Sequence, residues 1–245
     1  MGRAVEALAR ERGDDVVLRL DSAGEVVPDA FREEGAPAVD VAIDFTVPDA
    51  VVDNVRAVAG AGVDMVVGTT GWHDRLDEVE EIVEEAGTGL VWAPNFSLGV
   101  QAFFRIVRSA ARLADGLPGY DAYVSEVHHR HKLDRPSGTA RRLAEILVGE
   151  LSEIEAWAPV SGEGRIDPGI LQVTSVRAGE NPGAHSVVFE GEHDRIELAH
   201  RARGREGFAA GALEAAGWIV GRRGVFTVDE MLDERSSAGR GGSHG

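Results

Sequence analysis

The sequence predicts an α/β protein with a doubly wound parallel sheet, followed by a second, smaller unit of α+β type with a mixed sheet. Three observations lead to this expectation. Short apolar runs alternate with helical patterns in the first half of the 245-residue chain. Strand-like runs follow one another directly in the second half. With 43% hydrophobic residues, the chain is long enough to bury a core in each part.

The first half consists of repeated strand–helix units. A helix is expected to end at Gly13, a second to begin at the proline of residues 48–59, and a third to turn its acidic residues to solvent over 74–86. Strands are expected at residues 16–20, 39–45, 64–67 and 90–92. Such repeats form parallel sheets, and ligands bind outside the carboxyl ends of their strands. The residues that fall at these ends are Asp21, Thr46, Gly68–Thr70 and Ala93–Phe96.

The second half has a different rhythm. Helices are expected over residues 99–115, 140–150, 207–220 and 228–234. Strands are expected over residues 120–127, 170–177, 185–190 and 195–200, and their succession favours a mixed or antiparallel sheet. The Gly- and Ser-rich tail, 236–245, is expected to have no structure. We therefore assign residues 1–97 and 207–235 to one domain and residues 98–206 to the other.

Composition and charge argue against several classes of protein. With 42 acidic and 25 basic residues the formal net charge is −17, which disfavours nucleic acid as the main partner. No stretch approaches the about 18 consecutive apolar residues of a membrane span, and the first residues lack the apolar run of a signal peptide. Without cysteine, disulfides and thiolate chemistry are excluded. We expect a cytoplasmic protein whose acidity and scarcity of lysine are typical of halophilic proteins.

The most informative stretch is Glu126–Thr139, EVHHRHKLDRPSGT. Its residues His128–Lys132 can all carry positive charge in an otherwise negative chain, and Lys132 is the only lysine. Such a cluster repels itself unless an anion neutralises it, so a small anionic ligand is indicated. Ser137–Thr139 then opens a helix, where free backbone N–H groups favour a carboxylate or phosphate.

Three interpretations of this stretch are open. A catalytic acid with an anion clamp would use His128 and Lys132, which can both donate protons near neutral pH. A metal site, as in a metal-dependent hydrolase, would use His129 and His131 with Asp134. In the third interpretation the histidines are solvated surface groups. The single lysine favours the first, because arginine does not release its proton.

Around this motif the chain resembles a known family. The run EVHHRHKLDRPSGT is similar to the signature of the 4-hydroxy-tetrahydrodipicolinate reductases, also called dihydrodipicolinate reductases, of lysine and diaminopimelate biosynthesis. Further matching segments follow in the same order: Ile43–Thr46, Gly68–Gly71, Ala93–Ser97, Val176–Gly179 and Gly207–Ala209. The resemblance covers nearly the whole chain, and the histidine–lysine signature is its most specific part.

The resemblance implies a Rossmann-like domain that binds NADH or NADPH, and a domain that binds a small dicarboxylate and forms a homotetramer. It implies that hydride adds to an unsaturated cyclic imine while a proton reaches the neighbouring atom. His128 would be the general acid or base, and Lys132 a proton donor that also pairs with the substrate. The substrate would contact His129, Ser137, Gly138 and Thr139. The cofactor would contact Gly2, Arg3, Asp21, Gly68, Thr69, Thr70, Ala93, Pro94, Asn95 and Phe96.

The residues after the expected first strand and the start of the chain both bear on the cofactor. Asp21 would accept hydrogen bonds from the adenosine ribose, and Ser22 stands where relatives that use NADPH carry arginine, which favours NADH. The family's first strand and glycine-rich loop precede the point at which this chain begins, so the sheet would lack its first strand. We expect the working protein to begin upstream of Met1. The alternative that this gap suggests is a non-catalytic nucleotide-binding regulator, against which His128 and Lys132 argue.

Overall fold

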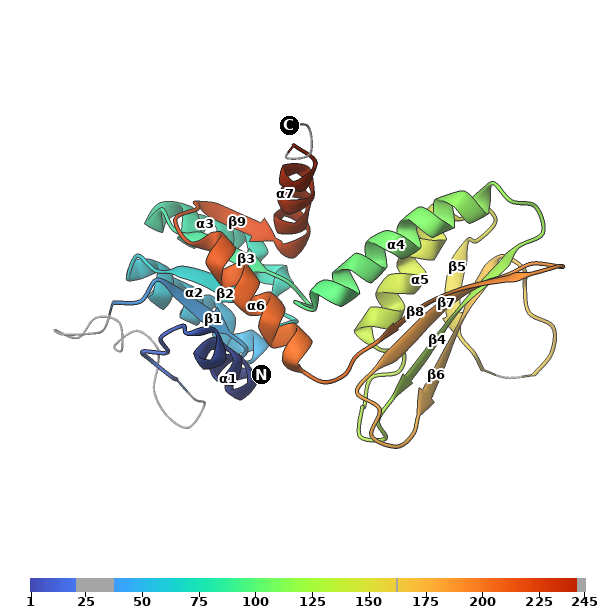
Figure 1. The fold of residues 1–245 in the computed structure, drawn as a ribbon, viewed down its shortest axis with the longest axis horizontal. Helices are drawn as coiled ribbons and strands as arrows, with labels where there is room; N and C mark the ends of the chain where they lie inside the picture. The colour runs from blue at the N-terminus through green and yellow to red at the C-terminus, as the bar shows by residue number, and fades with distance from the viewer. Residues whose placement is uncertain (21–37, 162, 242–245) are drawn as a thin grey trace. The chain divides into compact units, whose positions relative to one another are not determined.

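The chain folds into two compact units in a computed structural model that describes residues 1–20, 38–161 and 163–241. One unit comprises residues 1–97 and 206–245, and the other comprises residues 98–205 (Figure 1). The polypeptide therefore leaves the first unit once and returns to it for its last elements. No helix among the described residues is long and apolar enough to cross a membrane.

A four-stranded parallel sheet, in the order β1-β2-β3-β9, forms the centre of the first unit. Its strands are β1 (Val41–Asp44), β2 (Asp64–Val67), β3 (Gly89–Trp92) and β9 (Gly224–Thr227). Its α-helices are α1 (Gly2–Arg12), α2 (Val51–Gly60), α3 (Leu76–Ala86), α6 (Glu206–Ile219) and α7 (Val228–Gly241). Short 3-10 turns, η1 (Pro48–Ala50) and η2 (His73–Arg75), lead into α2 and α3.

Helices cover both faces of this sheet. Successive strand residues point to opposite faces. Ala42 packs with the buried valines of α2 and α3, whereas Ile43 packs with α1 and α6, and Figure 1 shows α6 lying across one side of the strands. Burial on both faces also explains why all four residues of β2 are buried. The doubly wound arrangement expected from the sequence is confirmed.

Three details of this unit differ from expectation. Residues 16–20 form no strand, because an apolar run becomes a strand only where a neighbouring strand pairs with it, and none pairs here among the described residues. Strand β9 is not predicted from the sequence, because it has only four residues and they lie between two predicted helices. The last helix does not end at residue 234 but continues to Gly241. In it the hydroxyls of Ser236 and Ser237 donate to carbonyls four residues earlier, at 2.8 and 2.9 Å.

The second unit is built on a five-stranded mixed sheet, in the order β5-β6-β4-β7-β8. Its strands are β4 (Asp121–His128), β5 (Ala156–Pro159), β6 (Ile170–Arg177), β7 (Ala184–Glu190) and β8 (Arg195–Arg201). The central strand β4 runs parallel to β6 and antiparallel to β7, so the expected mixed sheet is confirmed. Strand β5 was missed, because four residues ending in proline at a sheet edge carry little strand signal.

Two helices, α4 (Leu98–Asp115) and α5 (Gly138–Glu150), pack on one face of the mixed sheet. Alternate residues of β4 are buried beneath them. Ala122 and Val124 join the core around Leu143 of α5. Glu126 and His128 follow with the same spacing and point to the same face. The carboxyl end of the central strand thus carries two polar side chains into a buried position near the start of α5.

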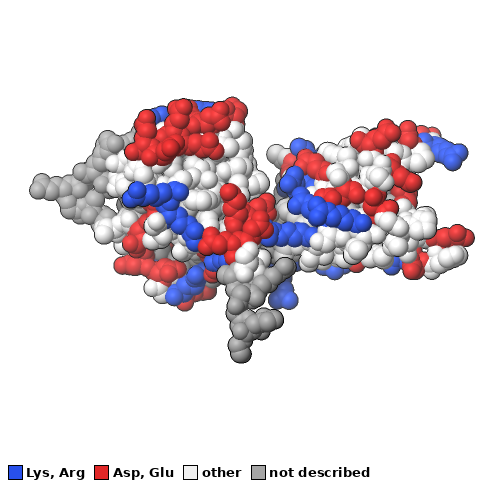
Figure 2. Space-filling model, turned by 90° about the horizontal axis from the view of Figure 1, so that it is seen from above, with Lys and Arg blue, Asp and Glu red and all other residues white. Residues whose placement is uncertain are grey.

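Acidic side chains lie on the surface, as the sequence predicts for the run in α3. Glu80, Glu81, Glu84 and Glu85 are exposed. On the face shown in Figure 2, Asp and Glu side chains gather in patches with cationic side chains between them. Most of this negative charge is therefore carried by solvated groups; the buried acidic residues of the described chain are Asp44, Asp64 and Glu126.

Candidate active site

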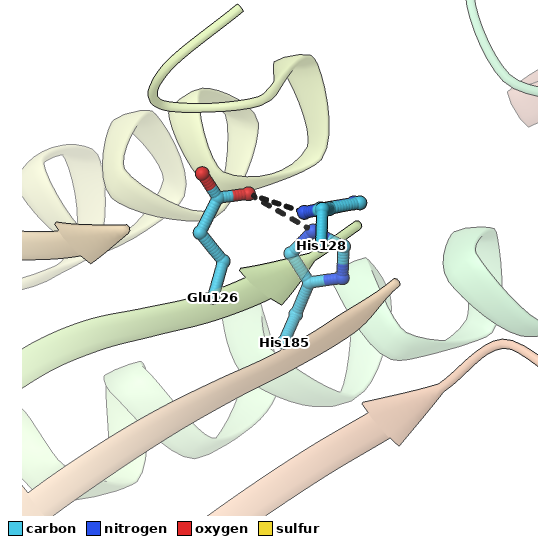
Figure 3. A group of neighbouring side chains, drawn as sticks. All are labelled: Glu126, His128 and His185. Atoms are coloured by element: carbon cyan, nitrogen blue, oxygen red, sulfur yellow. Dashed lines mark ion pairs between the residues drawn. The ribbon is translucent and has the colours of Figure 1, made fainter. Parts of the chain in front are cut away.

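The histidine–lysine motif begins at the carboxyl end of β4 and ends at the first turn of α5. The register of the sheet sets the neighbours of its first residues. Glu126 lies opposite Ser175 of β6 and opposite His185 of β7, and His128 lies opposite Arg177. Groups about 50 residues apart along the chain therefore meet around Glu126, as Figure 3 shows for the two histidines.

One carboxylate oxygen of Glu126 accepts hydrogen bonds from three donors, one at the start of α5 and two on β6. Oε1 accepts hydrogen bonds from the backbone N–H of Ser137 at 3.0 Å, from the Ser175 hydroxyl at 2.7 Å and from Arg177 Nη2 at 2.9 Å. The residue has no solvent exposure. A buried carboxylate requires such compensation, and the guanidinium supplies the opposite charge.

The second oxygen of Glu126 faces the two imidazoles. Oε2 lies 3.1 Å from His128 Nδ1 and 3.6 Å from His185 Nε2 (Figure 3). Burial raises the pKa of Glu126, but its interactions with the two histidines, Ser137 and Ser175 outweigh burial and bring the pKa well below its ordinary value. The carboxyl group is therefore ionised, and a negative charge lies against both rings.

The surroundings of His185 favour its neutral form. Burial lowers its pKa, and the positive charges of His128 and Lys132 add to that direction, while Glu126 opposes it. Its Nε2 lies 3.2 Å from the hydroxyl of Ser137, which caps α5 by accepting from the N–H of Ala140 at 3.2 Å. The buried ring thus connects β7 to the start of α5.

Lys132 lies in the turn after β4. Its N–H donates to the His129 carbonyl at 3.2 Å, and its Nζ pairs with Asp134 at 2.8 Å. Burial raises the pKa of Asp134, but the hydrogen bond and charge of Lys132 outweigh it and lower that pKa. His131 is exposed and pairs with Glu180 at 3.4 Å. The turn therefore presents one cation held by a carboxylate beside the buried histidine pair.

The metal site considered at His129, His131 and Asp134 is not formed in the described parts of the chain. The two rings are 6.0 Å apart between centroids. Over the described residues, the one group of histidine and acidic side chains placed to share a metal ion is Glu126 with His128 and His185, whose ligand atoms lie within 4.8 Å of one another. These are the atoms that already face each other as ion pairs.

The start of α5 is open where the motif ends. Ser137 is buried, Gly138 is exposed and Thr139 is half-buried. No atom lies within 4 Å of the position that a Cβ on Gly138 would occupy. The first N–H groups of a helix have no partner inside the helix, and the positive end of its dipole favours an anion. This turn is joined to His128 through Glu126, which contacts both.

The cofactor residues expected from the sequence gather at the carboxyl edge of the parallel sheet. Asp44 ends β1 and accepts from the hydroxyl of Thr69 at 2.6 Å, from Asn54 at 2.7 Å and from the N–H of Thr46 at 2.9 Å. Gly68 N–H donates to the Asp44 carbonyl at 2.8 Å. The ends of β1 and β2 are thereby held side by side.

The loop after β3 joins this edge. Ala93 N–H donates to the Val67 carbonyl at 3.2 Å, and the rings of Phe96 and Phe45 meet edge to face at 6.4 Å. A Cβ on Gly68 would come within 2.1 Å of the Phe45 ring, so only glycine fits there. The exposed residues of this edge are Thr70 and Pro94; Thr69, Ala93 and Phe96 are buried, and Gly68 and Asn95 are intermediate.

The remaining residues expected to bind the cofactor are not directly bonded to this edge of the sheet in the described structure. Gly2 and Arg3 are exposed in the first turn of α1. Met1 packs in the same hydrophobic cluster as Phe45, so this turn lies near the end of β1. Asp21 lies outside the described residues.

Comparison with known proteins decides the family. Residues 1–96 match the family model described as "Dihydrodipicolinate reductase, N-terminus", and residues 99–232 match "Dihydrodipicolinate reductase, C-terminus". The chain belongs to the dihydrodipicolinate reductase family. A 4-hydroxy-tetrahydrodipicolinate reductase from Methanopyrus kandleri is 41% identical over 238 residues, which cover 95% of this chain and 86% of that protein. One from Methanoculleus marisnigri is 45% identical over 214 residues, covering 85% and 82%.

Solved structures agree with this assignment. A dipicolinate-bound dihydrodipicolinate reductase from Paenisporosarcina sp. TG-14 superposes with a TM-score of 0.62 at 26% identity, covering 78% of this chain and 73% of that one. An amine dehydrogenase from Mycobacterium smegmatis shares the fold, with a TM-score of 0.55 at 10% identity. The resemblance drawn from the motif is thus confirmed at the level of family and fold.

The sequence motif alone indicates no role for Glu126 in this candidate site. For His185 it predicts a hydrogen bond within the sheet and not a part in the reaction, and the ring lies 3.2 Å from the Ser137 hydroxyl. The spacing of Glu126 and His128 carried a signal, since strand residues two apart point to the same face. His185 could be found only through the pairing of β4 with β7.

Proposed function

We propose that this chain reduces 4-hydroxy-tetrahydrodipicolinate to tetrahydrodipicolinate with a pyridine nucleotide, as a step of lysine and diaminopimelate biosynthesis. The substrate takes up a hydride and a proton, and its hydroxyl leaves as water. The observation that carries the proposal is the placement of the His128 imidazole 3.1 Å from a buried carboxylate in a chain of this family. Relatives that carry the name of this reductase support the substrate.

The carboxyl edge of the parallel sheet suits a nucleotide cofactor. Backbone of Gly68–Thr70 and of Ala93–Phe96 lines it, and glycine at position 68 allows close packing of the loops. When bound, the nicotinamide supplies the hydride that adds to the substrate. We assign its binding to these residues together with Gly2, Arg3 and Asp21. Ser22 favours NADH over NADPH, because it offers no cation to a 2′-phosphate.

The mixed-sheet unit supplies the proton and holds the substrate. His128 gives a proton to the reacting ring, and Lys132 donates a proton and pairs with a substrate carboxylate. The open first turn of α5, at Ser137, Gly138 and Thr139, binds a carboxylate together with His129. The dipicolinate named with the Paenisporosarcina reductase is a dicarboxylate, which supports this assignment of charge. We further assign tetramer formation to this unit.

The test is oxidation of NADH and of NADPH by the chain in molar KCl, with substrate formed in situ from pyruvate and aspartate semialdehyde. High salt is included because a chain of charge −17 is stabilised by screening. We expect absorbance at the nicotinamide band to fall only when both precursors are present, and faster with NADH. Absence of substrate-dependent oxidation with either nucleotide would contradict the proposal.

A further inference from the structure

The buried carboxylate of Glu126 is oriented before any substrate arrives. Oε1 accepts hydrogen bonds from three donors: the N–H of Ser137, just before α5, and the side chains of Ser175 and Arg177, both on β6. A carboxylate anchored in this way cannot rotate without breaking hydrogen bonds to donors that are themselves buried or partly buried. Oε2 is thereby fixed in its direction, toward the end of β4.

Oε2 is reserved for the imidazoles. It forms an ion pair with His128 Nδ1 at 3.1 Å, and neither atom has a hydrogen-bond partner in the described structure. His185 Nε2 is more distant from this oxygen, at 3.6 Å, and has Ser137 beside it. The His128 ring is therefore the group whose proton the free oxygen can fix.

The opposite nitrogen of His128 lies beside a glycine. A Cβ on Gly183 would come within 3.0 Å of Nε2 and 3.3 Å of Cδ2. Gly183 also has φ +147°, a conformation that other residues rarely adopt. The absence of a side chain at this position leaves the Nε2 edge of the ring uncrowded.

We propose that Glu126 is a positioning residue for His128. Its carboxylate holds the proton of the ring on Nδ1, so that Nε2 is the nitrogen that exchanges a proton with the substrate. The same negative charge favours the charged imidazolium. This inference rests on the proposed function, since it concerns the proton of that reaction. In neutral imidazole one nitrogen carries the proton, and the partner of that nitrogen decides which. The carboxylate accepts from Nδ1–H both before and after Nε2 gives up its proton.

The charges around His128 make Glu126 decisive. Arg177 of β6 lies opposite His128 in the sheet, and the His185 ring of β7 meets the His128 ring edge to face at 5.0 Å between centroids; Lys132, in the turn after β4, is a further cation of the motif. Asp134 offsets Lys132 by pairing with it. Glu126 is therefore the anion placed to stabilise a protonated His128, and removing its charge removes that stabilisation.

The experiment compares Glu126→Gln with the wild type across pH. The amide keeps the size of the side chain, but its NH2 cannot accept from Nδ1–H. We expect kcat at neutral pH to fall about 10-fold or more, with a smaller change in KM. We also expect the basic limb of the kcat/KM profile to move to lower pH by about one unit or more, because the acid loses its proton earlier. A loss of kcat with an unmoved profile would show a merely structural role and overturn the inference.

Asp64→Asn is the matched control. Asp64 is a buried carboxylate of the other unit, which accepts from the N–H groups of Gly89 at 2.7 Å and Gly221 at 2.8 Å. We expect its replacement to lower stability without moving the pH profile. An equal shift in both variants would remove the special role of Glu126.

A measurement on the wild type keeps the inference testable if Glu126→Gln does not fold. With ¹⁵N-labelled histidine, the His128 resonance is identified by its loss in His128→Gln. We expect the neutral ring to be protonated at Nδ1; protonation at Nε2 would overturn the inference. A wild type that does not oxidise NAD(P)H with substrate counts against the proposed function, whereas this tautomer is determined whether or not turnover occurs.

Discussion

Both units place a buried carboxylate at the end of a strand, but the two carboxylates have different partners. Asp44 of the parallel sheet binds the donors of Thr46, Asn54 and Thr69, none of which titrates near neutral pH. Glu126 of the mixed sheet binds two hydroxyl or amide donors as well, but it also faces an arginine and two histidines. A buried carboxylate thus fixes the edge of one sheet and, in our proposal, forms part of a site for proton transfer in the other.

The largest effect is expected where the proton itself is lost. In His128→Gln the ring is replaced by a side chain that cannot give up a proton, so kcat should fall about 10²- to 10⁴-fold. Nucleotide binding, followed by fluorescence titration, should stay within about twofold of wild type, because the cofactor edge belongs to the other unit. If the variant retains kcat within a few-fold of wild type, the Glu126 site is only structural, as the Asp44 site is.

Lys132→Arg tests whether the mixed-sheet site needs a second exchangeable proton or only a second charge. Arginine keeps the cation and can still pair with Asp134, but it does not release its proton. We expect kcat to fall about 10²-fold while KM for the substrate rises less. The matched control is His131→Gln, since His131 is exposed and pairs with Glu180 alone in the described structure. Near-normal kcat in Lys132→Arg would show that Lys132 contributes only its positive charge and not a proton.

Asp44→Asn is the counterpart of Glu126→Gln in the other unit. Asn at this position can accept at one oxygen only, so we expect a loss of about 1–3 kcal/mol in the free energy of unfolding, measured with urea. KM for the nucleotide should rise because the ends of β1 and β2 are no longer held together. The pH profile at saturating nucleotide should not move. A shifted profile here would erase the distinction between the two carboxylates.

The difference between the units also marks what could be predicted from sequence. The alternation of strands and helices was predictable because apolar residues repeat with a different period in each. The candidate catalytic residues were recognisable by residue type, as with the single lysine at position 132. Strands β5 and β9 could not be predicted, because each has only four residues and becomes a strand through pairing with a neighbouring strand. Glu126 and His185 escaped for a related reason: the register that joins β4 to β7 is a property of the folded sheet.

The smallest expected effect concerns stability against pH. His185 has its pKa lowered, first by burial, so the unfolded chain binds its proton more readily than the folded one does. The stability that depends on neutral His185 is therefore complete above the unfolded pKa, about 6.5, and is lost as pH falls through and below it. His185→Asn should flatten the decline in unfolding free energy between pH 7.5 and about 5.5, measured by urea titration at each pH. Asp44→Asn should leave that slope unchanged, because its partners do not titrate there. Equal slopes in wild type and His185→Asn would mean that folding does not lower the pKa of His185.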